Sequence, residues 1–166
     1  MAARLICKAQ MQGGFDREHA RWSHAALYIG GGRIVEATPF GGVRVGRLVD
    51  MTFDRHLLVR RRLDEALTME SRYAIVVDAL TGLRRGYSLG AVPRLAWRSW
   101  RRQLWAPDRR PDVGGVVICS TVVRNAYTTS IAVDLVPGTI SVTWPADLSH
   151  TAELEDVEIG WVQIVA

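Results

Sequence analysis

The stretch SHAALYIGGGRIVEAT, residues 23–38, decides the fold because two apolar runs flank a triple glycine. Glycine adopts positive φ without steric cost, so residues 30–32 predict the turn of a β-hairpin. We expect its two arms to span about residues 23–29 and 33–38.

The length of the hairpin loop determines which residues share a face. If the loop has three residues, Glu36 lies opposite Ala26, on the same face as His24 and diagonal to it. A two-residue loop shifts the register by one position and moves Glu36 to the other face. A contact between His24 and Glu36 therefore depends on this register.

A second informative stretch is VVICSTVVRNAY, residues 116–127, in which a short apolar run meets a helical pattern at Cys119. Apolar residues follow at helical spacing, and they are Val122, Val123, Ala126, Tyr127 and Ile131. We expect a helix over about residues 119–135, with Cys119 in its first turn. The alternative is that Cys119 is a small core residue, since free cysteine is often buried.

The rest of the chain predicts an α+β protein. A helix is expected over about residues 68–85, with Thr68 as its N-cap and Gly86 as its stop. Its expected buried stripe is Tyr73, Val76, Val77, Leu80 and Leu83. Further strands are expected at 41–49, 56–62, 139–144 and 157–166, with PADL (145–148) as a turn. Helices flank these strands without strict alternation, which favours α+β over a doubly wound fold.

Length and composition predict a single domain over residues 1–166. The apolar runs are too short to cross a bilayer, and the N-terminus lacks the features of a secretory signal. We therefore expect a protein that is cytoplasmic as synthesised, with signal-independent export or release on lysis left open. The net charge of +4 suggests an anionic partner or, more simply, a biased coding composition, since Lys8 is the only lysine.

Cofactor and metal sites are not predicted. The two cysteines, Cys7 and Cys119, are too few for a disulfide framework. The four histidines show no ligand spacing with each other or with the cysteines, and no dinucleotide or P-loop motif is present. Cys7 lies in an apolar patch and is expected to be structural, whereas His19 and His150 are expected at the surface.

Residues 94–110 interleave tryptophan with arginine. Trp97, Trp100 and Leu104 fall on one face of a short predicted helix. One interpretation is a surface helix docked through its tryptophans, with arginine stems over the edge. The other is a flap that contacts substrate or membrane, in which Trp97 and Trp100 are candidate substrate-binding residues.

The expected position of Cys119 at a helix start, with His24 as a candidate neighbour, suggests nucleophilic chemistry. A helix N-terminus favours a thiolate, and a neighbouring histidine activates it and later protonates a leaving group. A third group should orient the imidazole, and Glu36 is our candidate, with His56 and Asp50 as alternatives. Tyr28, on the same strand face as His24, is a candidate substrate-binding residue or a cross-strand packing residue.

These motifs resemble the circularly permuted branch of the NlpC-type, papain-like superfamily, which includes YiiX/YebB-like proteins and, distantly, the lecithin:retinol acyltransferase relatives. The family pattern is a histidine opening a strand of the type HxxxYxG, an acidic or polar residue in the next strand, and a cysteine that starts a helix. His24, Glu36 and Cys119 match these positions. TWPADL (143–148) also resembles the proline-containing return of the family. The resemblance spans residues 20–165, although the Arg/Trp segment has no counterpart.

The resemblance implies a papain-like α+β domain with a Cys-His-Glu triad that hydrolyses or transfers an acyl group. Cell-wall peptides are the favoured substrate, as for a toxin-like or phage-encoded lytic enzyme, and lipid amides are the alternative. The expected partner is a peptide, peptidoglycan or lipid-amide substrate and not a nucleic acid. Two non-enzymatic alternatives stay open: a nucleic-acid-binding module, suggested by the Arg/Trp segment, and a silent family member that serves as a binding scaffold.

Overall fold

The computed structural model describes residues 2–38, 41–52, 56–62, 67–83, 118–138 and 143–158, and every structural statement below concerns these residues. The described part is a mixed α+β structure with two small antiparallel sheets, in agreement with the predicted class. Three predicted features lie outside the described part: the Arg/Trp segment with Trp97 and Trp100, the helix stop at Gly86, and residues 159–166 of the last strand.

The larger sheet is formed by three consecutive strands in the order β1-β2-β3. They are β1 (Ala26–Gly30), β2 (Arg33–Thr38) and β3 (Gly42–Arg47), all paired antiparallel. The predicted hairpin is therefore confirmed, and so is the further strand at 41–49, except that residues 48 and 49 belong to a helix. Residues 23–25, expected in the first arm, lie before β1, so His24 precedes the strand and does not pair within it.

The hairpin reaches the predicted register by a different route. Ala26 pairs with Glu36, as expected for the three-residue loop. However, Gly30 pairs with Arg33, which leaves only two residues in the turn, and an irregularity between Tyr28 and Gly30 compensates for the missing loop residue. Gly30, Gly31 and Gly32 have φ of 93°, 57° and 70°, which explains why glycine occupies all three positions.

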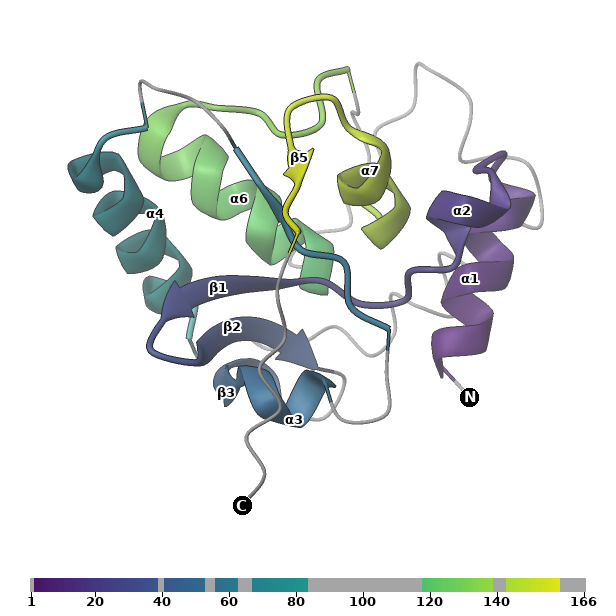
Figure 1. The fold of residues 1–166 in the computed structure, drawn as a ribbon, viewed down its shortest axis with the longest axis horizontal. Helices are drawn as coiled ribbons and strands as arrows, with labels where there is room; N and C mark the ends of the chain where they lie inside the picture. The colour runs from purple at the N-terminus through teal and green to yellow at the C-terminus, as the bar shows by residue number, and fades with distance from the viewer. Residues whose placement is uncertain are drawn as a thin grey trace.

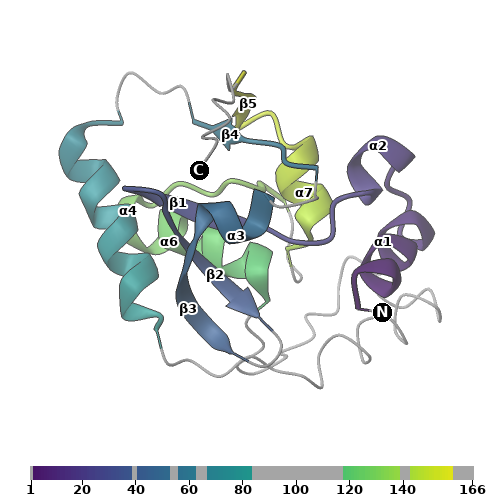
Figure 2. The same cartoon turned by 60° about the horizontal axis from the view of Figure 1, so that its bottom comes forward.

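Helices α4 (Met69–Thr81) and α6 (Cys119–Ile131) lie side by side, and α6 contacts β1 and β2 (Figures 1 and 2). The core between them is apolar and includes Val35, Ala79, Val123 and Ala126. The second predicted helix is confirmed at its start, but it ends at Ile131 and not at residue 135. It stops because Ala132 adopts a left-handed conformation, with φ of 56°.

The first predicted helix starts as expected, since the Thr68 side chain accepts a hydrogen bond from the Ser71 N–H. It ends at Thr81 with Gly82 as its C-cap. The predicted stripe is only partly right: Leu80 and Leu83 pack against the core and are partly buried, whereas Tyr73 and Val77 are exposed. The buried residues of the helix are Ile75 and Ala79. Apolar residues occur on several sides of this helix, so periodicity alone does not select the face that α6 covers.

A second group of helices packs around Gln10, and sequence patterning did not predict it. It consists of α1 (Ala2–Gln12), α2 (Arg17–Ala20) and α7 (Pro145–His150), the last of which replaces the predicted PADL turn. Gln10 is buried, and its side-chain amide donates to the carbonyls of Ala20 and Trp22. Its side-chain oxygen accepts the Ala146 N–H, so a single residue joins α1 to both other helices.

The smaller sheet pairs β4 (Arg60–Arg61) with β5 (Glu155–Asp156). The Arg60 guanidinium donates to the carbonyls of Leu148, Ser149 and Thr151, which closes the C-terminal end of α7. Of the strand predicted at 56–62, only these two residues form a strand, and next to them the Val59 carbonyl accepts the Val157 N–H at 2.8 Å. Residues 143–144 and 157–158, predicted as strand, are irregular, while the short helix α3 (Leu48–Thr52) follows β3.

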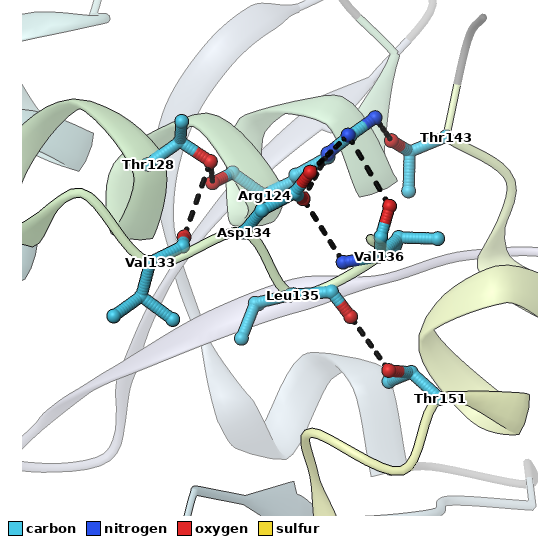
Figure 3. Close-up of polar contacts among 8 residues, drawn as sticks. All are labelled: Arg124, Thr128, Val133, Asp134, Leu135, Val136, Thr143 and Thr151. Atoms are coloured by element: carbon cyan, nitrogen blue, oxygen red, sulfur yellow. Dashed lines mark hydrogen bonds and ion pairs between the residues drawn. The ribbon is translucent and has the colours of Figure 1, made fainter. Parts of the chain in front are cut away.

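The chain that follows α6 is held back against the helix by Arg124 (Figure 3). Its guanidinium makes two bonds of 2.7 Å to the Asp134 carboxylate and also donates to the Thr143 hydroxyl. The paired cation lowers the pKa of Asp134. Leu135 beside it is fully buried, and its carbonyl accepts from the Thr151 hydroxyl at 2.6 Å.

Among the helices of the described ranges, none combines the length and apolar character needed to span a bilayer.

Replacing Gln10 with methionine should lower the free energy of unfolding, because the Ala20 and Trp22 carbonyls and the Ala146 N–H would lose their partner. Each buried polar group left unpaired costs on the order of 1–3 kcal/mol. Urea unfolding monitored by circular dichroism measures the difference. The matched control is Gln12→Met on the exposed side of the same helix, and equal stability of the two variants would contradict this role for Gln10.

Candidate active site

Cys119 is the first residue of α6 and is almost fully buried, with 4% of its surface exposed. The preceding residue, Ile118, has extended backbone, so the chain turns sharply into the helix at the cysteine. The first intrahelical bond runs from the Val122 N–H to the Ile118 carbonyl. The N–H groups of residues 119–121 are therefore the ones that no helical carbonyl accepts, and they favour negative charge there.

The environment of the sulfur favours the thiolate. Burial by itself raises the pKa of Cys119, but its hydrogen bond to His24 and the charge of that imidazolium outweigh burial. The backbone N–H groups of Ala25 and Ser120 add further hydrogen bonds to the sulfur. The net result is a pKa below the ordinary thiol value.

His24 lies between the sulfur and a carboxylate. Its Nε2 is 2.8 Å from Oε2 of Glu36, and its side chain also interacts with Cys119. Burial lowers the pKa of His24, but the hydrogen bonds and charges of Cys119 and Glu36 more than compensate and raise it to about 9. The imidazolium form is therefore favoured at neutral pH.

Glu36 completes the group from the middle of β2. Its side chain is only 7% exposed, and it accepts from His24 on one oxygen and from Arg44 on the other. The hydrogen bond to His24 lowers the pKa of Glu36, burial opposes the change, and the hydrogen bonds from Arg44 lower the pKa further. The structure thus brings together the three residues that the sequence selected.

A comparison of the chain with models of known protein families finds no match, and a comparison with curated protein sequences finds none either.

Ser120 contributes to the site in a way that sequence reasoning missed. It is fully buried, and its hydroxyl donates to the Thr143 carbonyl at 2.5 Å. Because Arg124 also contacts Thr143, the first turn of α6 is attached to the segment that leads into α7. The serine after a helix-starting cysteine was the available signal, although its partner lies 23 positions away.

The alternatives for the third residue lie elsewhere. Asp50 is exposed on α3 and pairs loosely with Arg47 at 3.8 Å, and His56 is exposed beyond it. Tyr28 is 56% exposed, and its hydroxyl accepts from the Gly32 N–H at the hairpin turn. The Tyr28 hydroxyl therefore stabilises the hairpin turn, and the side chain does not pack in the interior.

The remaining candidate groups are placed as follows. Cys7 is half-buried; burial raises its pKa, and its thiol donates to the Arg21 carbonyl. His150 is exposed, as predicted, but His19 is half-buried and its Nδ1 lies 2.7 Å from the Ser149 hydroxyl. Within the described ranges, no set of three or more histidine, cysteine or acidic side chains is arranged to hold a metal ion.

This geometry can support attack by sulfur on a carbonyl. A thiolate with an adjacent imidazolium provides both a nucleophile and a proton donor, and a carboxylate fixes the orientation of the ring. The N–H of Cys119 is a candidate donor to an oxyanion, since the Ser120 N–H is already directed at the sulfur.

Replacing His24 with alanine should raise the pKa of the Cys119 thiol, since burial would remain without the balancing cation and only the Ala25 and Ser120 N–H groups would still favour the thiolate. Thiolate ultraviolet absorbance, titrated in a Cys7→Ser background, measures the change, and alkylation by iodoacetamide provides a second readout. His56→Ala is the matched control, because this histidine is exposed and lies outside the group. An identical titration with and without His24 would show that the two side chains do not interact.

Replacing Cys119 with serine should lower the pKa of His24 from about 9, because the hydrogen bond and negative charge of the thiolate disappear while burial remains. The imidazolium of the variant would then lose its proton at lower pH than that of the wild type. NMR titration of the His24 ring protons follows this directly. A midpoint that stays near 9 would assign the whole shift to Glu36.

Proposed function

We propose that this protein is a papain-like cysteine hydrolase that cleaves an amide or ester bond through an acyl-enzyme. The observation that carries the proposal is the row Cys119–His24–Glu36, with the sulfur at a helix N-terminus and the ring held at 2.8 Å by a buried carboxylate. A purely structural cysteine needs neither a lowered pKa nor a charged histidine beside it.

In the proposed mechanism, the Cys119 thiolate attacks the substrate carbonyl carbon and forms a carbon–sulfur bond. Negative charge moves to the carbonyl oxygen, where the Cys119 N–H donates to it. The His24 imidazolium then protonates the leaving amine or alcohol as the scissile bond breaks. Glu36 keeps the ring oriented through both states and stabilises its positive charge.

The second half of the reaction returns the site to its starting state. Neutral His24 takes a proton from water as the water oxygen attacks the thioester. The carboxylic acid product leaves, and the sulfur departs as a thiolate beside the imidazolium. The charges of the resting site are thereby restored, with no cofactor required by these steps.

The substrate class comes from the resemblance to the permuted NlpC-type branch, which favours cell-wall peptides. A toxin-like effector or a phage-encoded lytic enzyme would fit the small size of the chain. Lipid amides, used by other members of the same superfamily, are the alternative substrate.

Incubation with purified peptidoglycan should release new muropeptides, and Cys119→Ala should abolish their release. His24→Ala should reduce the rate by roughly 10²–10⁴-fold, the usual contribution of a general acid–base. Liquid chromatography with mass spectrometry identifies the cleaved bond, and Cys7→Ala is the matched thiol control. Unchanged fragments from a protein whose Cys119 titrates as a thiolate would exclude cell-wall peptides, and a panel of lipid amides would then test the alternative.

A further inference from the structure

A fourth residue, Arg44, is bound to the candidate triad from β3. Its Nε and one terminal nitrogen donate to the same Glu36 oxygen, at 3.0 and 2.8 Å. The other Glu36 oxygen faces His24. The carboxylate is thus held at both ends, and the bond from Arg44 uses the oxygen that His24 does not.

The pairing of the strands makes this contact possible. Glu36 lies directly opposite Arg44 in the β2–β3 ladder, so their side chains emerge on the same face. Gly46 lies two positions further along β3, and a Cβ added there would lie 3.1 Å from Oε1 of Glu36. The absence of a side chain at Gly46 therefore leaves the space that this oxygen occupies.

We propose that Arg44 is a positioning residue that fixes the Glu36 carboxylate against His24, with Gly46 leaving the room that this orientation needs. A role of Arg44 in catalysis rests on the proposed function, whereas its contact with Glu36 does not depend on any reaction. Glu36 is 7% exposed, so without Arg44 one of its oxygens would lose its charged partner inside the protein.

Arg44 also matters when the charges of the triad change. During the acyl-enzyme step His24 is neutral, and Glu36 then has no imidazolium beside it. Arg44 supplies a permanent positive charge, because a guanidinium does not lose its proton in proteins. The planar guanidinium also fixes the orientation of the Glu36 carboxylate, which an ammonium group does less well.

The test compares Arg44→Gln, Arg44→Lys and Gly46→Ala with wild type by NMR titration of His24. The groups that face His24 in the described structure are Cys119 of α6 and Glu36 of β2, with Arg44 of β3 behind Glu36. If Arg44 orients the carboxylate, its loss lets Glu36 turn away and the pKa of His24 falls below about 9. A fall of half to one unit corresponds to a roughly threefold to tenfold weaker hold on the proton.

Arg44→Lys should retain part of the effect, since it keeps the charge without the planar guanidinium. Gly46→Ala should lower the His24 midpoint with every charge intact, because it displaces the carboxylate sterically. Arg47→Gln is the matched control: it lies on the same strand, loses the same charge and contacts Asp50 instead. Thermal unfolding of each variant confirms that it is folded.

An unchanged His24 midpoint in Arg44→Gln would overturn the proposal. A higher midpoint would also overturn it, because Arg44 would then act only as a charge that competes for Glu36. These readouts do not use turnover, so a protein that cleaves no substrate can still support the positioning role. Conversely, active enzyme with an unaltered His24 titration would reject the positioning role alone.

Discussion

The pairing of Ala26 with Glu36 in the hairpin is the constraint on which the candidate site depends. Side chains alternate along a strand, so a slip of one residue would turn Glu36 toward the apolar core and bring Val35 to the face that carries Arg44. The irregularity before Gly30 accommodates one extra residue in β1 and so keeps Ala26 paired with Glu36. A local feature of a glycine turn thereby decides whether a carboxylate meets the histidine at all.

The second constraint is the position of the α6 N-terminus. Ser120 and Arg124 both reach Thr143, and Arg124 also holds Asp134, so the helix is fastened near its start and through the segment that follows it. Its apolar side packs on α4 and on the sheet. The sulfur is therefore placed by rigid packing, while the backbone N–H of Ala25 approaches it from the segment that carries His24.

Much of this arrangement could be predicted from local sequence patterns. The triple glycine located the hairpin, the helical spacing after Cys119 located α6, and Thr68 marked the start of α4. The proximity of His24 to Glu36 could be predicted because the two residues are only 12 positions apart and flank one hairpin, although His24 lies just before β1 and the register is restored by an irregularity that the sequence did not show.

The features that escaped prediction depend on partners distant in sequence. Gln10 and Ser120 look like ordinary polar residues until Ala146 and Thr143 fold against them. Tyr73 and Val77 of α4 were wrongly expected to be buried because the helix is apolar on more than one side, and only packing in the core selects Ile75 and Ala79. Arg44 belongs to no motif that the sequence showed, and its contact with Glu36 forms only because β3 pairs with β2.

When the thiol is ionised, Arg44, Glu36, His24 and Cys119 form a row of alternating charges that sums to zero. Such a row projects little electric field into the surroundings, even though the chain as a whole carries +4. Three of its four members are largely shielded from water, so dissolved ions screen them weakly. The row itself therefore contributes little to long-range attraction of ions, and what approaches the sulfur depends more on the shape and chemistry of the surfaces around it.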